Sequence, residues 1–471
     1  MSGFSLQELA IKPDSSYQKT IFYYFMMRNQ MRRLILTICI ALLSISPALA
    51  GPDGTTTIKE SVEAAVKHHP QIKALLHNRD AVSNDLSSAL GRFFPSLDLA
   101  VNYGLQNYDS RATRADNKDG DTNTASDSTL TLTQNVFDGM NRYNDYQGSK
   151  NRLESAEHRL YDNVENIALD AIRAHIDIVR ERKLVALAGE NITDHQEVLD
   201  SIAERVAGGA GNKADEMQAR GRVARAETTL ISYMGNLRIA EAEYRRVTGL
   251  DAGPLQDSGF KMDAIPASMD TIMNEALENN PKVKAIKADV AATERDKGVV
   301  TAAYMPTVNI ELSSRYTDDL DGSETYLNDN RAMLALNWNL FNGTSDYYNR
   351  QSADDRIKET KANLQNTVED LSRQVATAWT EYQTAVQSIQ KHQEALQYSM
   401  ESRDMYLMQF NVGQRSLLDV LDSINEVFSN SVLLETAMSN REFSLYRFLT
   451  LEGRLIKALE VNQAAYDPEA Q

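Results

Sequence analysis

The chain has 471 residues, a formal net charge of −17 and a single cysteine, Cys39. A protein that binds nucleic acid would ordinarily be basic, so the acidic balance argues against that class. One cysteine excludes an intrachain disulfide and a metal site built from cysteines. The sequence also contains no nucleophile-elbow or phosphate-loop motif, and it therefore predicts no enzyme activity, no cofactor and no bound metal.

The first predicted element is a secretory signal peptide at residues 31–50. Two consecutive arginines precede an apolar run at 34–43, and Ala48-Leu49-Ala50 fits the small-residue cleavage pattern. Ten apolar residues are too few to span a bilayer as a helix. Residues 1–30 lie before the basic start, and we interpret them as a non-native N-terminal extension from an upstream start codon.

The remainder of the chain is predicted to be a tandem duplication. Pro70 and Pro95 recur as Pro281 and Pro306, in each case 211 residues later, and further landmarks recur 204 residues apart. The first copy is expected at 55–250 and the second at 268–455. A linker at 251–267 joins the copies, and a tail follows at 456–471.

Each copy opens with a predicted helix and continues with two predicted strands. Thr57 and Glu60 have the spacing of a helix capping box. Apolar and polar residues then alternate over about ten positions, which predicts half-buried strands of membrane-spanning length. The strands are expected at 96–107 and 128–137 in the first copy and at 307–316 and 332–341 in the second. The apolar side chains expected to face lipid are Leu97, Leu99, Val101, Tyr103, Leu130 and Leu132, and then Val308, Ile310, Leu312, Leu334, Leu336 and Trp338.

Aspartate-rich segments at 109–128 and 317–330 separate the strands of each pair. The first ligand position of a calcium loop would fall on Ala115 or Thr317, neither of which is an acid. We therefore expect solvated loops without calcium.

A long helical run follows each pair of strands. Residues 141–206 contain no proline, and their apolar residues recur every seven positions, which is typical of coiled-coil packing. A second helix, at about 215–248 and again at 416–455, must fold back antiparallel to the first. Gly209 and Gly413 mark the turns, because glycine tolerates the backbone angles of a tight reversal.

Four strands are too few to close a barrel, and an open sheet edge is not tolerated in lipid. The strands must therefore be shared between chains, and two chains would supply eight strands whereas three would supply twelve. Eight strands leave only enough interior for side chains, while polar residues on the second strand face suit a wet lumen. We therefore expect a homotrimer with a twelve-stranded barrel, its lumen lined by Asp98, Asn102, Gln106, Asn337 and Asn339.

Two short motifs accompany the duplicated order of elements: F-[DN]-G follows the second strand of each copy, and V-G-x-x-S-x-x-D occurs at 412–419. With these motifs the chain resembles the TolC family of outer-membrane channels over residues 55–455. The resemblance implies a mainly α protein with a β-barrel: a trimeric twelve-stranded outer-membrane barrel, four strands per chain, continued by a long periplasmic coiled-coil tunnel. It also implies a Gram-negative host, a periplasmic adaptor (membrane fusion protein) and an inner-membrane pump as partners.

The resemblance further implies a gate at the hairpin tips. Arg415 matches the arginine that ties neighbouring helices together, and Asp215 matches its acidic partner on the first turn. Asp419 and Asp422 match the acids at the narrowest point, where a trimer would form rings that favour cations. Phe410 stands where drug-efflux relatives carry a tyrosine, and it has no hydroxyl to donate to Asp215.

Residues 175–227 resemble the branch of the family that serves type I secretion. We therefore expect a passive exit duct for substrate exported by an inner-membrane ABC transporter and its adaptor. One alternative is the outer-membrane component of a multidrug or metal efflux pump. A periplasmic coiled-coil scaffold is a more remote alternative, because it would not explain the strands.

Overall fold

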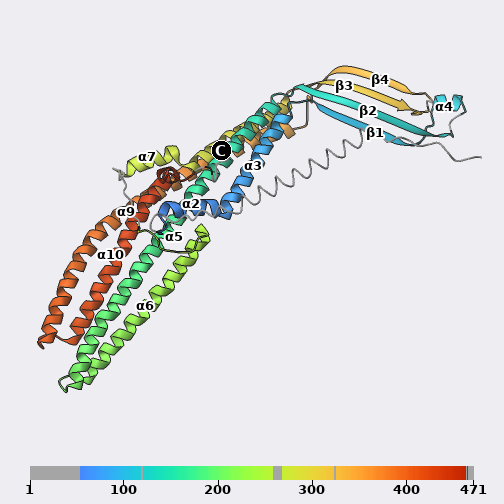
Figure 1. Ribbon diagram of the computed structural model, residues 1–471. Coiled ribbons are helices and arrows are strands. Elements are labelled where there is room, and N and C mark those ends of the chain that lie inside the picture. The colour runs from blue at the N-terminus through green and yellow to red at the C-terminus, as the bar shows by residue number, and fades with distance from the viewer. Residues whose placement is uncertain (1–53, 118–119, 258–267, 323–324, 463, 465–471) are drawn as a thin grey trace, which may run out of the picture. The chain divides into compact units, whose positions relative to one another are not determined.

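Two long helical hairpins and one four-stranded sheet dominate the computed structural model (Figure 1). The structure describes residues 54–117, 120–257, 268–322, 325–462 and 464. The predicted signal peptide at 31–50 and the extension at 1–30 lie outside the described residues, as does most of the predicted linker. From Thr55 onward the chain forms one compact unit, which is described here.

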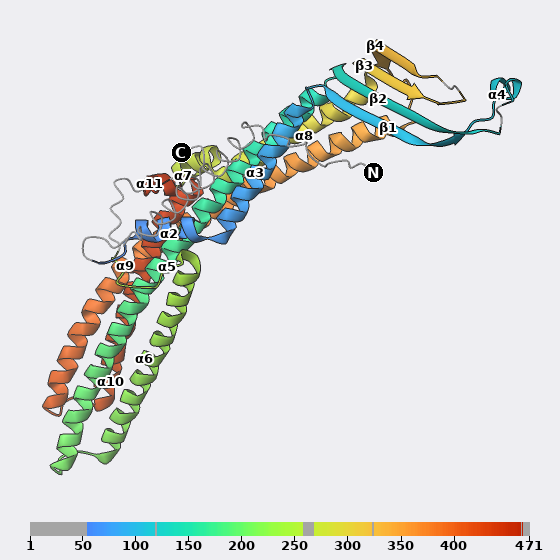
Figure 2. The same cartoon turned by 45° about the vertical axis from the view of Figure 1, so that its right-hand side comes forward.

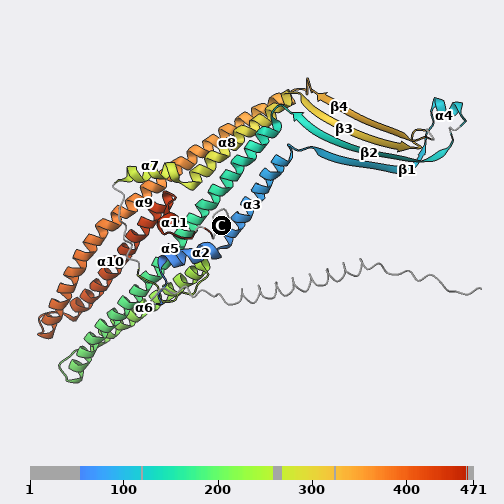
Figure 3. The ribbon, with the colours of Figure 1, turned by 45° about the horizontal axis from the view of Figure 1, so that its top comes forward.

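The sheet is antiparallel throughout, with the strand order β1-β2-β3-β4. The strands are β1 (Ser96–Asn107), β2 (Thr122–Phe137), β3 (Thr307–Asp318) and β4 (Leu327–Asn337). Strand β2 pairs with β3, so the sheet is built from both copies. Strands β1 and β4 form its two edges, as Figure 3 shows. Within the described residues no strand pairs with their outer sides.

The strand register places the apolar residues of all four strands on one face. Leu97 pairs with Leu132, which pairs in turn with Leu312, and farther along the sheet Val308 pairs with Leu336. These side chains have no covering element, since Leu99 is 69% exposed and Leu334 is 71% exposed. The chain therefore presents a broad uncovered apolar face, and contact of that face with lipid stays a prediction.

The second strand of the second copy was predicted at 332–341, and this prediction was wrong at both ends. Strand β4 begins at Leu327 and ends at Asn337, so Trp338 lies beyond the strand. Its indole Nε1 donates a hydrogen bond to the Tyr304 carbonyl at 3.2 Å. The strand ends here because Asn339 accepts a hydrogen bond from the backbone N–H of Phe341 at 3.2 Å, a local turn that competes with strand pairing.

The segment between β1 and β2 is not only an irregular loop. A short helix, α4 (Arg111–Ala115), starts after Ser110, whose hydroxyl accepts from the Thr113 N–H at 3.2 Å. Strand β2 also begins at Thr122, six residues before the predicted start at 128. Five of the six residues at 122–127 are polar and they occupy both faces, so the extension carries no apolar–polar alternation to detect.

The helices follow the predicted duplicated order. They are α2 (Ile58–His68), α3 (Pro70–Gly91), α5 (Asn141–Ala207) and α6 (Lys213–Thr248) in the first copy, and α7 (Met269–Asn279), α8 (Pro281–Thr301), η1 (Ala302–Tyr304), α9 (Ser345–Asn411), α10 (Leu417–Leu451) and α11 (Leu455–Ala458) in the second. The capping box is confirmed, since Thr57 Oγ1 accepts from the Glu60 N–H and Glu60 accepts from the Thr57 N–H. None of the helices within the described residues has the length and apolarity needed to cross a membrane.

Helix α10 ends four residues before the predicted end at Leu455. The break falls at Gly453, which has a φ of +65°. A Cβ at this position would come within 2.7 Å of the Pro281 ring. Glycine is therefore required both for the backbone angle and for the close approach to α8.

The two hairpins, α5 with α6 and α9 with α10, pack side by side through α5 and α10 (Figure 2). One apolar core joins α2, α5 and α11, and a second joins α7, α9 and α10. A third core lies near the hairpin tips and contains Val198 of α5, Val223 of α6 and Leu421 of α10. The seam between the hairpins is therefore apolar close to both turns.

Glu165 of α5 anchors the short C-terminal helix α11. Its carboxyl group accepts hydrogen bonds from the backbone N–H groups of Leu455 at 2.9 Å and Ile456 at 3.3 Å. Burial is the largest influence on this group and raises the pKa of Glu165 from 4.5 to about 8. The folded protein therefore keeps this proton at neutral pH, whereas the unfolded chain releases it.

We expect Glu165→Gln to remove one component of the pH dependence of stability. The folded pKa lies above the unfolded one, so the stabilisation is complete below about pH 4.5 and is lost as the pH rises to about 8. The melting temperature of the wild type should fall relative to that of the variant between pH 5 and pH 8. Thermal unfolding in detergent at several pH values measures this, and a constant difference would contradict the assignment.

Candidate functional site

The two hairpins reverse direction through the same turn. Gly209 has a φ of +77° and Gly413 a φ of +76°. In both turns the glycine N–H donates to the carbonyl three residues back, and the next N–H donates to the carbonyl five residues back, at 2.8–3.1 Å. This pair of bonds is the Schellman motif, in which a left-handed glycine closes the end of a helix. The predicted turn glycines thus occupy equivalent positions in the two copies.

A polar side chain caps the helix that leaves each turn. Asn212 accepts from the Ala214 N–H at 3.0 Å at the start of α6. Ser416 Oγ accepts from the Asp419 N–H at 3.3 Å at the start of α10, and the same hydroxyl donates to Asp419 Oδ2 at 2.9 Å. Asp419 is therefore held in the first turn of α10, where a negative charge also complements the helix dipole.

Arg415 contacts residues of its own hairpin. Its guanidinium lies 3.8 Å from the centre of the Tyr406 ring, a cation–π contact with α9. Its Nε lies 3.2 Å from Asp419 Oδ2, as an ion pair without hydrogen-bond geometry. Within this chain Arg415 forms no ion pair or hydrogen bond with Asp215, which is half-buried in the first turn of α6. The Asp215 carboxylate has no hydrogen-bond or ion-pair partner among the described residues.

Asp422 forms an ion pair with the other hairpin. Its Oδ1 lies 2.5 Å from Nη2 of Arg222 on α6. The Asp422 side chain is 56% exposed and that of Arg222 is 22% exposed. The two neighbouring acids of α10 therefore differ, because Asp419 is held by its own helix turn and Asp422 is paired across the seam.

Phe410 lies at a second contact between the hairpins. The guanidinium of Arg205 on α5 sits 4.9 Å from the centre of the Phe410 ring. The same guanidinium donates to Asn411 Oδ1 at 3.0 Å. Phe410, which has no hydroxyl to donate to Asp215, thus stacks against a cation of the neighbouring hairpin instead.

Three residues that the structure brings to this site were not predicted from the sequence: Arg222, Arg205 and Tyr406. Arg222 and Arg205 make their contacts between the two hairpins, with residues 200 or more positions away in the sequence, whereas Tyr406 contacts Arg415 within its own hairpin. No local motif marks such a pair. The one available signal was that Arg222 lies two helical turns after Asp215 on the same face of its helix.

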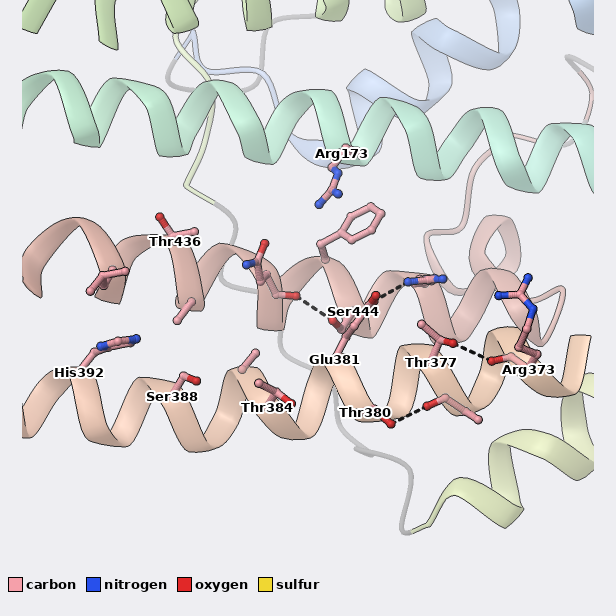
Figure 4. Close-up of a pocket in the computed structure, with 17 residues that line it drawn as sticks. Arg173, Arg373, Thr377, Thr380, Glu381, Thr384, Ser388, His392, Thr436 and Ser444 are labelled. Carbon is pink, nitrogen blue, oxygen red and sulfur yellow. Dashed lines mark hydrogen bonds and ion pairs between the residues drawn. The ribbon is translucent and has the colours of Figure 1, made fainter. Parts of the chain in front are cut away.

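One cavity among the described residues lies between α9 and α10, away from the tips (Figure 4). It has a volume of about 840 Å³, and hydroxyl side chains from Thr377 to Ser388 line its α9 side. Arg447 pairs with Glu381 across it at 2.5 Å, and Arg173 of α5 stacks on Phe443. The described residues contain no group of three or more potential metal ligands. Hydroxyl, charged and apolar side chains therefore share the lining of this cavity.

A sequence profile of the outer membrane efflux protein family matches residues 62–250 and 272–449. The two matched segments fall one in each predicted copy. Together they include both strand pairs and both hairpin tips.

Individual relatives are distant but extensive. The outer membrane efflux protein BepC of Brucella suis biovar 1 (strain 1330) is 24% identical over 343 residues, which are 72% of this chain and 75% of that protein. The outer membrane protein TolC of Salmonella enteritidis is 20% identical over 78% of this chain and 76% of its own. The cobalt-zinc-cadmium resistance protein CzcC of Cupriavidus metallidurans (strain ATCC 43123 / DSM 2839 / NBRC 102507 / CH34) is 20% identical over 56% and 62%, respectively.

Solved structures share the fold. A membrane protein from Pseudomonas aeruginosa superposes with a TM-score of 0.76 at 16% identity, covering 86% of this chain and 92% of that one. The Campylobacter jejuni CmeC outer membrane channel gives a TM-score of 0.75 at 15% identity, with coverages of 84% and 86%. The mainly helical fold with four strands per chain is thus the fold of these proteins.

Proposed function

We propose, since this chain belongs to the outer membrane efflux protein family, that it is the passive exit duct of a type I secretion system. Family membership makes it an outer-membrane efflux channel of the TolC type from a Gram-negative bacterium, and not an enzyme. Most of the chain is helical and belongs to the periplasm. In the proposed assembly, an inner-membrane ABC transporter supplies the substrate through a periplasmic adaptor.

The observation that carries the channel function is the sheet. It has one uncovered apolar face and two edge strands, β1 and β4, whose outer sides are unpaired within the described chain. An unpaired edge facing hydrocarbon would cost several kcal/mol for each unsatisfied backbone group. Three copies that pair β1 of one chain with β4 of the next would remove every edge and give a barrel of twelve strands. The face of the sheet that carries Asp98 and Asn102 would then line the lumen.

The resemblance of residues 175–227 to the secretion branch supports protein as the cargo. The relatives supply a second candidate, because BepC is named an efflux protein and CzcC a cobalt-zinc-cadmium resistance protein. The second candidate is therefore the outer-membrane component of a drug or metal efflux pump. The two candidate functions differ in the exported substrate, which is a protein in type I secretion and a drug or metal ion in efflux.

Deleting the gene in its own bacterium separates the two candidates. For type I secretion we expect at least one large protein to disappear from the culture medium and to return on complementation, while resistance to drugs and to cobalt, zinc and cadmium is unchanged. An unchanged set of secreted proteins together with lowered resistance would overturn the secretion proposal in favour of efflux.

We place the gate of this duct at the hairpin tips. In the trimer, Arg415 of one chain would reach the free carboxylate of Asp215 on the next, which would hold the hairpins closed. Asp419 would form a ring of three carboxylates in the constriction. Like charges at close quarters draw in cations.

Asp419→Asn is expected to weaken block of the channel by divalent cations several-fold, because the ring loses its charge. Single-channel recording in planar bilayers with added magnesium or cobalt measures the block. Glu401→Gln, which removes an exposed acid from α9, is the matched control and should leave the block unchanged. Equal block in the wild type and both variants would remove Asp419 from the constriction.

A further inference from the structure

We propose that Arg222 is a clasp between the two hairpins of each chain and that it neutralises Asp422 while the gate is closed. Opening would separate the pair and add Asp422 to the acidic ring, so that charge in the constriction increases as it widens. The inference rests on the proposed function, because it assumes that α10 lines the gate.

The first observation is that the contact between Arg222 and Asp422 is shorter than the other ion pairs between the two hairpins. Among the described residues, three ion pairs join the α5–α6 hairpin to the α9–α10 hairpin. Lys183 lies 3.4 Å from Glu435, and Arg403 lies 3.5 Å from Asp194. Arg222 and Asp422 lie 2.5 Å apart, which is hydrogen-bond distance. The tightest ionic contact between the hairpins is therefore the one involving a gate residue.

The second observation is the position of the pair on its helices. Arg222 directly precedes Val223, and Asp422 directly follows Leu421, and both of these apolar residues belong to the core that joins the hairpin tips. The ion pair thus covers the edge of that core. Separation of α10 from α6 has to break the ion pair before the core beneath it is exposed.

The third observation is a buried histidine, His195, that lies near Arg222. His195 of α5 is 3% exposed, and its Nδ1 has no hydrogen-bond partner among the described residues. Burial, and then the nearby positive charge of Arg222, lower the pKa of His195 to about 4. The imidazole is therefore neutral and does not compete with Arg222 for the carboxylate. Asp422 is the single anion that contacts Arg222 within the described chain.

These observations make the two acids of α10 unequal in the closed state. Asp419 lies 3.2 Å from Arg415 of its own hairpin without hydrogen-bond geometry, whereas Asp422 is hydrogen-bonded to Arg222 of the other hairpin at 2.5 Å. In a closed trimer Arg222 would hold each Asp422 carboxylate across the seam, and in an open trimer those three carboxylates would be released into the constriction. The affinity for cations would then rise with opening.

Two substitutions at the same ion pair distinguish this proposal from a purely structural role. Arg222→Gln and Asp422→Asn both break the clasp, so both should raise single-channel conductance in planar bilayers. Only Arg222→Gln leaves Asp422 free, so it should tighten block by magnesium several-fold, whereas Asp422→Asn should not. Arg225→Gln removes an exposed arginine of the same helix and should match the wild type in both measurements.

The double exchange Arg222→Asp with Asp422→Arg restores the pair in reverse and should return conductance to the wild-type value. Wild-type conductance and wild-type magnesium block in Arg222→Gln would overturn the clasp. So would a tightened block in Asp422→Asn equal to that in Arg222→Gln. A wild-type protein that forms no channel would instead refute the proposed function, so the two failures are distinct.

Discussion

Replacing Leu336 with arginine is expected to abolish stable insertion of the protein in the outer membrane. Leu336 lies on β4 opposite Val308, on the uncovered apolar face, and is 63% exposed. An arginine on the lipid face of a barrel costs about 2–4 kcal/mol near the bilayer midplane. A trimer would bear that cost three times, which is comparable with the whole stability of an ordinary domain.

The matched control is Ala335→Arg at the preceding position. Ala335 pairs with Asn309 and therefore lies on the opposite, polar face of the same strand. This variant should still insert, since its charged group would enter water. Membrane fractionation and the heat-modifiable mobility of folded protein on gels measure insertion. Equal insertion of the two variants would show that the apolar face does not contact lipid.

The second large effect is expected for Arg415→Ser, which should raise single-channel conductance several-fold. Arg415 is held over Tyr406 and beside Asp419, so its guanidinium is already oriented at the tip. Serine removes both the charge and the planar group that could tie the tip to a neighbouring chain. The resting gate should therefore spend more time open.

Arg415→Lys is the informative companion variant. Lysine keeps the charge but loses the planar fork and much of the stacking on tyrosine. Its conductance should fall between those of the wild type and of Arg415→Ser. If all three conductances agree, Arg415 does not hold the gate closed.

The sheet could be predicted from the sequence wherever residues alternate. The apolar residues from Leu97 to Leu336 share one face, as the period of two requires. The prediction of strand ends failed where a local hydrogen bond or a polar composition, and not the alternation, determines where a strand begins or ends. The apolar residues after Asn337 continue the alternation, yet the turn at Asn339 ends β4 before Trp338. The start of β2, at 122–127, has polar residues on both faces and one buried apolar residue, Ala125, so only its pairing with β1 defines it.

At the hairpin tips, too, some features could be predicted from the sequence and others could not. The turns could be predicted, because Gly209 and Gly413 recur at one spacing and glycine has a specific backbone role there. The contacts between the hairpins could not. Arg222 meets Asp422 only because α6 and α10 pack together near their tips, and a single sequence does not specify which residues meet across such a seam.

The sharing of strands between chains is the central claim, because within the described residues the outer edges of β1 and β4 have no partner strand. Native mass spectrometry of the processed protein, released from detergent micelles, tests this directly by counting chains. We predict a single species of three copies that requires detergent to remain in solution. A monomer that is stable in water without detergent would contradict the shared barrel and, with it, the channel.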